Sequence, residues 1–377
     1  MAGIYIHIPF CKKACHYCDF HFSTSLKQKD ELLEALIKEI KLQKDYFSEK
    51  SFPLKTIYFG GGTPSLLSAT EINSLVKAVK ETFPVEANAE ITLEANPDDL
   101  TKEIITDLKT TEINRLSIGI QSFRDEDLKL MNRAHSSQMA EASVKAVQKA
   151  GFHNITIDLI YGIPGLSRED WLINLQKAFA LDVPHISAYS LTIEPKTAFA
   201  HLIKKGQMKM PDDEISSSHF ELMLEEIDKN GYLQYEISNF SRDGWHSRHN
   251  SSYWSGAEYL GIGPSSHSYN GKTRQWNKAN NSIYIKSLSE GIIPFEREEI
   301  SVNTAYNEYV LTALRTAKGV DLNKVKDFGE DFLEYCLKEN ELYLSRKQTV
   351  LEGNRIRLTK EGKLFADAIA AQFFKLE

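Results

Sequence analysis

The sequence predicts an α/β fold, a partial (β/α)6 barrel of parallel strands followed by a smaller C-terminal domain with a helical, winged-helix-like pattern. Strand and helix patterns alternate regularly through the first half of the chain. The length of 377 residues suffices for a barrel of about 250 residues and a smaller domain. Six segments with period-2 hydrophobicity end in glycine, proline or polar residues. They are residues 3–9, 55–59, 90–96, 115–121, 154–161 and 185–193.

Amphipathic helical patterns separate these strands. One apolar stripe comprises Leu33, Leu36, Ile37 and Ile40, and another comprises Ile72, Leu75, Val76 and Val79. Strands that alternate with helices at this spacing indicate repeated βαβ units and therefore a parallel sheet.

The two faces of the predicted strands differ in chemistry. One face is apolar and is expected to pack on the helices: Ile4, Ile6, Ile8, Ile91, Leu93, Ala95, Leu116, Ile118, Ile120, Ile155, Ile157 and Leu159. The other face is polar: Tyr5, His7, Thr92, Glu94, Asn96, Ser117, Gly119, Gln121, Thr156 and Asp158. A closed eight-stranded barrel fills its interior with apolar side chains, so a polar interior predicts a wider, open lumen that holds a ligand. A solvated sheet face is the alternative, but a parallel sheet is normally covered on both faces.

The sequence as a whole predicts three domains: residues 1–235 as the barrel, 236–300 as an extension that closes it, and 301–377 as the C-terminal domain. A helical pattern runs from about residue 212 to 230, and a region rich in glycine, serine, histidine and aromatic residues spans 245–276. The tail reads as helix, helix, hairpin around residues 353–354, then helix. It has no basic recognition helix, so we do not expect DNA binding.

Composition narrows the function classes. The net charge of −7 argues against a nucleic-acid partner, because a phosphate-binding surface usually shows as a basic excess. The first residues lack the basic start and apolar run of a signal peptide. No stretch of about 20 apolar residues predicts a transmembrane segment. We therefore expect a cytoplasmic protein.

The cysteines are few and unevenly placed. Cys11, Cys15 and Cys18 form a C-x3-C-x2-C motif directly after the first strand, while Cys336 lies far away in an apolar helical pattern and is predicted to be a small buried hydrophobe. In a reducing compartment such crowding points to metal binding or catalysis. Three thiolates on a [4Fe-4S] cluster leave one iron open for chemistry. The alternative is a structural zinc site completed by His16 or His21.

Five further motifs follow in order at the predicted strand ends. They are Tyr5-Ile-His-Ile-Pro-Phe-Cys11, Gly60-Gly-Gly-Thr-Pro64, Glu94-Ala-Asn-Pro97, Gly119-Ile-Gln-Ser-Phe123 and Asp158-Leu-Ile-Tyr-Gly-Ile-Pro164. With the cysteine motif they resemble the HemN/HemW group of the radical S-adenosylmethionine (SAM) superfamily, from residue 3 to the tail. The resemblance implies a cluster on the three cysteines and SAM on its open iron. An incoming electron would then break the sulfonium C–S bond to give a 5'-deoxyadenosyl radical.

The resemblance also implies which residues bind SAM. They are Tyr5, Gly61, Gly62, Thr63, Glu94, Gln121, Arg133 and Asp158. For several of them there is a plainer interpretation: the glycine run can form an ordinary turn, Tyr5 can simply pack, and the two carboxylates can pair internally with Arg115 or Arg133. No Lys-Ser or Lys-Thr follows the glycines, which excludes a P-loop.

Two features separate the branches of this group. The dehydrogenase branch, which acts on coproporphyrinogen III, has a fourth cysteine in an extended C-x3-C-x2-C-x-C motif, whereas Phe20 occupies the position of this fourth cysteine here. The dehydrogenase branch also carries a long N-terminal extension. The motif His249-Asn-Ser-Ser-Tyr253-Trp254 resembles the H-N-x-x-Y-W heme motif of the other branch. The expected function is a heme chaperone that receives electrons from a donor and delivers heme to an apo-hemoprotein. Dehydrogenase activity is the alternative.

The predicted heme ligand is His249, because imidazole is a usual axial ligand and aromatic rings offer flat surface to a porphyrin. A histidine in a loop beside aromatic residues is also a common hydrogen-bonded packing residue. His246 and His267 could compete as ligands, and the latter lies where relatives contact a SAM molecule.

Overall fold

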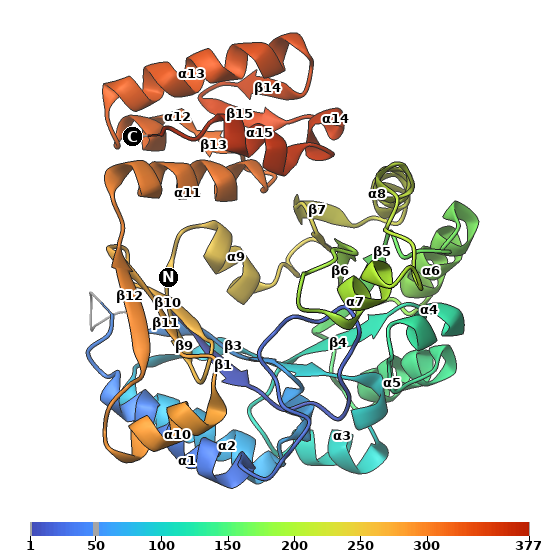
Figure 1. The fold of residues 1–377 in the computed structure, drawn as a ribbon, viewed down its shortest axis with the longest axis vertical. Helices are drawn as coiled ribbons and strands as arrows, with labels where there is room; N and C mark the ends of the chain where they lie inside the picture. Colours follow the sequence, from blue (N-terminus) through green and yellow to red (C-terminus); the bar gives the residue numbers. More distant parts are fainter. Residues whose placement is uncertain (1, 48–52, 377) are drawn as a thin grey trace.

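Six parallel strands form the centre of the fold, as predicted. The computed structural model describes residues 2–47 and 53–376. Within this part of the chain the strands lie in the order β1 to β6 at the centre of a 12-stranded sheet (Figure 1). Their bounds are β1 Ala2–Ile8, β2 Leu54–Gly61, β3 Val85–Ala95, β4 Arg115–Gln121, β5 Ile155–Tyr161 and β6 His185–Ser190.

The strand boundaries differ from the prediction mainly at two ends. β3 begins at Val85, five residues before the predicted start at residue 90. The alternation continues through Val85–Ala89, but two of its three apolar residues are small alanines and Ala87 is exposed, so the hydrophobic signal there is weak. β6 ends at Ser190, three residues before the predicted end, since Leu191 leaves the ladder and its amide donates to the Tyr161 carbonyl.

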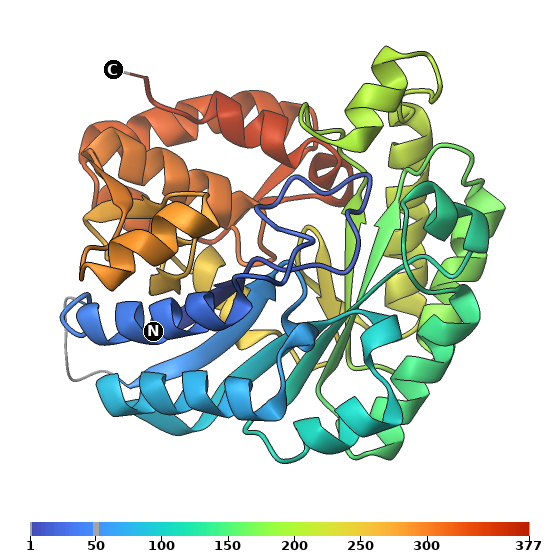
Figure 2. The same cartoon turned by 60° about the horizontal axis from the view of Figure 1, so that its bottom comes forward.

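Helices cover the outer side of the sheet, and their starts follow from local sequence. Ser68 and Glu71 form a reciprocal capping box at the start of α2, and Thr101, Ser136 and Ser167 cap α3, α5 and α6. Figure 2 shows this layer of helices against the sheet. The helices of this half are α1 Lys29–Leu42, α2 Ala69–Thr82, α3 Lys102–Leu108, α4 Asp125–Leu130, α5 Ser137–Lys149, α6 Arg168–Ala180, α7 Ala198–Lys204 and α8 Asp213–Lys229.

The apolar strand faces are buried against these helices, as expected from their pattern. Ile4, Ile6 and Ile8 of β1 are fully buried, and so are Leu116, Ile118 and Ile120 of β4. Because side chains alternate along a strand, the polar residues between them must face the other side. That side is the inner one, where helix α9 (Arg248–Trp254) lies against β1, β2 and β9.

The segment from residue 236 to 300 adds strands to the sheet. β7 (Leu233–Glu236) and β8 (Asn239–Ser241) extend it beyond β6, and β9 (Glu258–Ile262) runs parallel to β1. Antiparallel strands β10 His267–Tyr269, β11 Thr273–Asn277 and β12 Phe295–Glu299 follow, with α10 Asn281–Ser289 between the last two. The sheet is therefore open, with β12 and β7 at its edges. The predicted boundary at 235 falls inside β7, and the division into domains stays a prediction.

The C-terminal region has a hydrophobic core of its own. Cys336 is fully buried in it, which confirms the prediction for this residue. Backbone hydrogen bonds from Ile237 to the Arg315 carbonyl and from Ala317 to the Tyr235 carbonyl tie it to the β7 edge. Its elements are α11 Val302–Leu314, β13 Val320–Asp321, α12 Leu322–Lys326, α13 Glu330–Ser345, β14 Thr349–Glu352, β15 Arg355–Leu358, α14 Lys360–Lys363 and α15 Ala366–Gln372. Within the described ranges, no helix has both the length and the apolarity to cross a bilayer.

A buried carboxylate joins α1 to the extension. Glu39 of α1 is fully buried, and it accepts hydrogen bonds from the Gly263 amide, from Asn277 Nδ2 and from the Tyr284 hydroxyl. Burial is the main cause that raises the pKa of Glu39 to about 7. The folded state therefore binds this proton more tightly than the unfolded chain does.

This shift predicts a pH-dependent stability. The stabilisation of the folded state by the protonated Glu39 side chain is fully present below about pH 4.5, and it is lost as the pH rises through about 7. Between pH 5 and pH 8 we expect the free energy of unfolding of the wild type to fall by roughly 2 kcal/mol more than that of Glu39→Gln. Urea unfolding at several pH values measures this difference. Glu34→Gln, at an exposed position of the same helix, is the control, and parallel wild-type and Glu39→Gln curves would contradict the assignment.

Candidate functional site

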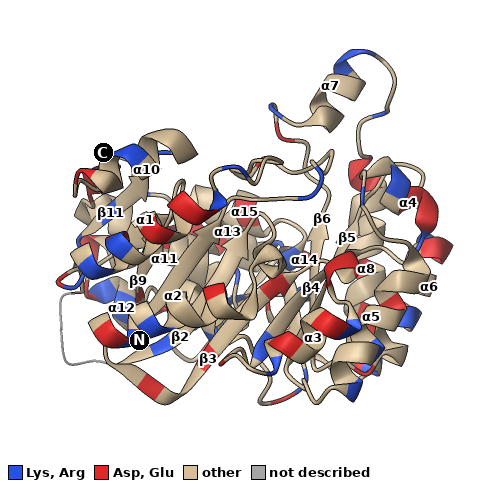
Figure 3. Ribbon diagram, turned by 90° about the horizontal axis from the view of Figure 1, so that it is seen from below, with Lys and Arg blue, Asp and Glu red and all other residues tan. Residues whose placement is uncertain are grey.

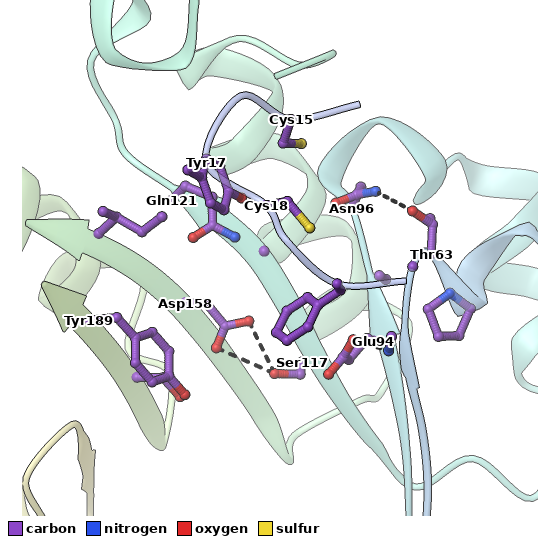
Figure 4. A pocket seen from close by; sticks show the side chains of 18 of the residues that line it. Cys15, Tyr17, Cys18, Thr63, Glu94, Asn96, Ser117, Gln121, Asp158 and Tyr189 are labelled. Carbon is purple, nitrogen blue, oxygen red and sulfur yellow. Dashed lines mark hydrogen bonds between the residues drawn. The ribbon is translucent and has the colours of Figure 1, made fainter. Parts of the chain in front are cut away.

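All the residues predicted to bind the cluster, SAM or heme line one cavity. It has a volume of about 640 Å³ and lies on the inner side of the sheet, below the loop that follows β1. The lining includes Cys11, Cys15 and Cys18 with Tyr5, Gly61, Gly62, Thr63, Glu94, Gln121, Arg133, Asp158 and His249. Figure 4 shows Cys15, Cys18, Glu94 and Asp158 pointing into this space. The polar strand faces thus enclose the open lumen expected from the sequence.

The cysteine loop is held at its neck and at its tip. At the neck, the Cys11 amide donates to the Ser23 carbonyl at 3.0 Å and the Ser23 amide donates to the Pro9 carbonyl at 2.8 Å. At the tip, the His16 ring donates from Nδ1 to the Leu130 carbonyl at 2.9 Å, and Asn132 Nδ2 donates to the Ala14 carbonyl. These bonds hold the three thiols around the cavity mouth.

The donor set fits a cluster better than zinc. A tetrahedral zinc site would need the thiols and an imidazole to converge on one ion. Among the residues that the structure describes, no three His, Cys, Asp or Glu side chains are close enough to hold one ion. The thiolates of a [4Fe-4S] cluster bind different irons and need no such convergence. Burial raises the pKa of Cys18 to about 11 and also raises that of Cys11, so iron binding must release protons.

The glycine run after β2 is required by close packing. A side chain at Gly62 would place its Cβ 2.6 Å from the Phe10 carbonyl oxygen and 2.8 Å from that of Ile8. Gly61 has a φ of +108°, and a Cβ there would come within 2.4 Å of the His7 ring. The run therefore lets the start of the cysteine loop pass directly over the end of β2. This is more than the ordinary turn considered from the sequence.

Arg133 links three parts of the site. Its Nη2 donates to Asn96 Oδ1 and to the Gly119 carbonyl, both at 2.6 Å, and its Nη1 lies 3.3 Å from Cys15 Sγ. Its buried Nε has no partner among the described residues. The guanidinium thus stands beside the cysteine loop with a donor to spare, as the binding of a carboxylate from a ligand requires.

Glu94 and Asp158 lie on either side of Ser117 in the lumen (Figure 4). Glu94 accepts from the Tyr58 hydroxyl at 2.8 Å and from the Gly61 amide at 3.2 Å. Burial, with the nearby Asp158 charge, raises the pKa of Glu94 to about 7, and burial raises that of Asp158 to about 6.

The internal salt bridges considered from the sequence are absent from the described part of the chain. Arg115 lies 3.8 Å from Glu90, and neither Glu94 nor Asp158 has an ion-pair partner within the described ranges. Both carboxylates are therefore available to accept hydrogen bonds from a ligand.

Gln121 ends β4 in an unusual backbone conformation. Its φ is +69°, which is uncommon for a residue other than glycine. The pairing of β4 with β5 shifts register between Ile118 and Gln121, so the strand turns its last side chain into the cavity. Strained residues of this kind cluster at binding sites.

Sequence reasoning missed several lining residues. Tyr17, Tyr58, Arg115, His185 and Tyr189 also line the cavity. Tyr58 lies two residues before Gly60 on β2, and alternate residues of a strand face the same side. The alternation that identified Glu94 on β3 would therefore also have identified Tyr58. His267 does not line the cavity; it is exposed on β10, where its ring stacks on Trp276.

His249 lies on helix α9, where we had expected a loop, and its ring is buried at the floor of the lumen. Its Nδ1 is 2.7 Å from Thr56 Oγ1 and its Nε2 is 3.0 Å from the Tyr253 hydroxyl. The ring also stacks on Tyr58 with centroids 4.8 Å apart. Burial lowers the pKa of His249 to about 3, so the ring is neutral. This geometry matches the packing alternative, and an axial bond to iron would require one of the two hydrogen bonds to break.

Comparisons with known proteins support the assignment of the chain to the radical SAM superfamily. Residues 5–177 match the family model of the Radical SAM superfamily, and residues 300–365 match that of the HemN C-terminal domain. The heme chaperone HemW of Bacillus subtilis (strain 168) is 34% identical over 378 residues, which cover 99% of both chains. The chain belongs to the HemW family.

Other members of the HemW family are similarly close. HemW of Lactococcus lactis is 36% identical and the match covers 95% of this chain and 93% of that one. HemW of Escherichia coli (strain K12) is 38% identical over 70% of this chain and 69% of that one. Among solved structures, coproporphyrinogen III oxidase (HemN) from Escherichia coli superimposes with a TM-score of 0.85 at 24% identity, covering 99% of this chain and 90% of that one. That likeness shows that this chain has the same fold as HemN.

Proposed function

We propose that this chain is a heme chaperone that binds a [4Fe-4S] cluster, SAM and heme and delivers heme to an apo-hemoprotein. The observation that carries the proposal is the near full-length similarity to curated relatives that are named heme chaperone HemW. Phe20 supports it, because this exposed aromatic residue occupies the position of the fourth cysteine in the dehydrogenase motif. The crowding of Cys11, Cys15 and Cys18 in one short loop, which is typical of metal binding or catalysis in a reducing compartment, also supports a cytoplasmic location.

The residues of the lumen fit the two cofactors. Cys11, Cys15 and Cys18 would hold the cluster, and Arg133 would pair with the methionine carboxylate of SAM. Glu94 and Asp158 would accept hydrogen bonds from the ribose hydroxyls or the methionine ammonium. When bound and reduced, the cluster supplies the electron that cleaves the sulfonium bond of SAM. The protein's own part is to orient SAM and to exclude water and oxygen.

The heme proposal centres on α9. We propose His249 as axial ligand, with Tyr253 and Trp254 as flat partners for the porphyrin. His249 is neutral, the form that ligates iron, but its nitrogens are engaged with Thr56 and Tyr253. His246, three residues earlier, is exposed, and no described residue hydrogen-bonds its ring, so it is the main competitor.

Heme titration of histidine variants tests this proposal. We expect His249→Ala to weaken heme binding by about tenfold or more, since an axial bond is lost. His185→Ala is the matched control, because His185 is equally buried and its ring is bonded in the same way by Thr156 and by Tyr235. The Soret band reports binding, and thermal unfolding reports stability. Unchanged affinity in His249→Ala, with a loss in His246→Ala, would move the ligand to His246.

The second candidate function is the oxidative decarboxylation of coproporphyrinogen III, which the fold shared with HemN favours. Phe20 argues against it. Incubation of reconstituted protein with coproporphyrinogen III, SAM and a reductant without oxygen distinguishes the two functions. We expect heme transfer to an apo-hemoprotein and no decarboxylated product, and product formation would favour the enzyme.

A further inference from the structure

A basic arm projects from the body of the protein at the mouth of the lumen. We define the arm as residues 195–211, which connect β6 to α8 and contain α7 (Ala198–Lys204). Figure 3 shows α7 standing clear of the remaining helices, with basic residues near its tip. The arm carries four lysines and no aspartate or glutamate, in a chain whose net charge is −7. The positive charge is thus concentrated where the overall composition would not predict it.

The four lysines have no counter-charge within the described structure. Lys196, Lys204, Lys205 and Lys209 are all exposed, and none of them forms an ion pair with a described residue. Other lysines are neutralised, as Lys12 is by Asp98 and Asp99. The acidic residues nearest in sequence lie at the base of the arm, where Glu194 lines the cavity, Asp212 caps α8, and Asp213 and Glu214 follow in the first turn of that helix. Unpaired like charges on one projection produce a positive field that attracts an acidic partner.

The arm is fixed to the cysteine loop. The Phe199 amide donates to the His16 carbonyl at 2.9 Å, and the Phe199 and His16 rings meet edge to face with centroids 5.9 Å apart. Phe199 is fully buried in this contact. His16 lies between Cys15 and Cys18, so the arm is held directly against the loop that holds the thiols. Lys13, in the same loop, is also exposed.

We propose that the arm and Lys13 dock a small acidic electron-transfer protein that reduces the cluster. This inference rests on the cluster assignment proposed above. Electron-transfer encounters bury small interfaces and depend on charge complementarity for their association rates. A partner bound here lies beside the backbone of the loop that carries the three thiols.

An anionic membrane is the other acidic surface that lysines attract, and the arm does not suit it. Membrane-surface helices expose an apolar face with bulky side chains beside their basic face. α7 has only seven residues, and Phe199, the sole aromatic residue of the arm, is buried against the cysteine loop. A protein partner is therefore the better fit.

Charge reversal tests the proposal. The variant Lys204→Glu/Lys205→Glu changes the charge of the arm by four units, and Lys145→Glu/Lys149→Glu makes the same change on the exposed face of α5. The probe is reduced flavodoxin, an acidic one-electron donor, added to the cluster-loaded protein. We expect cluster reduction, followed by electron paramagnetic resonance, to slow by about tenfold or more at low salt in the arm variant only, and by less at high salt. Reduction by dithionite, a small donor, should be unchanged.

Other outcomes would overturn the proposal. Equal slowing in the α5 variant would show that only the net charge matters, and unchanged flavodoxin kinetics would remove the arm as a docking surface. If dithionite also fails to reduce the cluster of the arm variant, the test is repeated with Lys196→Glu/Lys209→Glu, which changes the other two lysines of the arm. Failure of dithionite to reduce the cluster of this second variant would reject docking. Binding to anionic phosphatidylserine vesicles that the arm variant loses, with normal flavodoxin kinetics, would assign the arm to a membrane. Failure of wild-type protein with dithionite would instead reject the cluster.

Discussion

Replacement of Cys15 by serine is expected to remove the iron–sulfur cluster and with it any cleavage of SAM. The three thiols are the only cysteines of the loop, and Cys336 is buried in the separate C-terminal core, out of reach. Two thiolates and a serine hydroxyl bind iron–sulfur clusters far more weakly than three thiolates do. We expect about four irons and four sulfides per wild-type chain to fall by more than tenfold in Cys15→Ser. Metal and sulfide analysis after anaerobic reconstitution measures this, and 5'-deoxyadenosine formation should fall in parallel.

Cys336→Ser is the matched control for this experiment. It also replaces one cysteine, but in the C-terminal core, so it should retain the iron content while losing some stability from a buried hydroxyl. If Cys15→Ser kept its iron, or if both variants lost iron equally, the cysteine loop would not be the cluster site.

Replacement of Arg133 by lysine is expected to weaken SAM binding by roughly 30- to 100-fold, about 2–3 kcal/mol. The guanidinium reaches Asn96, the Gly119 carbonyl and Cys15 Sγ at once, and a single ammonium cannot present donors in this fork. Its unpartnered Nε would also be lost to the ligand. Equilibrium binding of SAM to cluster-loaded protein measures the change.

Iron content separates a binding effect from a structural one in this test. Arg133→Lys should keep its cluster, because no thiol is removed. Arg124→Lys is the control, since Arg124 pairs with Asp127 at the start of α4 and does not line the cavity. SAM affinity within twofold of wild type would show that Arg133 only braces the cysteine loop.

Much of the barrel could be predicted because its strands are buried on one face and line a lumen on the other. In β4, Ile118 and Ile120 mark the buried face, and Gly119 and Gln121 mark the face toward the lumen. Both faces can be read from seven residues, and the predicted strand has the same bounds as the observed one. At the start of β3 the alternation continues, but its apolar positions are mostly small alanines and Ala87 is exposed, so the observed start at Val85 lies outside the predicted range.

The pairing of distant segments could not be predicted. β9 joins β1 in parallel although more than 200 residues separate them, and Glu39 of α1 binds groups near residues 263, 277 and 284. A lone glutamate in an amphipathic helix reads as a surface residue. Only its neighbours in space reveal it as a buried acid with a raised pKa.

The amino-acid sequence by itself determined the fold class, the position of the cysteine loop and the polar lining of the lumen, because these depend on spacing and alternation within short segments. Tertiary structure alone decided that the ring of His249 is enclosed by Thr56, Tyr58 and Tyr253, that Arg133 reaches the cysteine loop, and that a basic arm lies beside it. The physical reason is that burial, and with it protonation and hydrogen bonding, is set by groups far away in the chain.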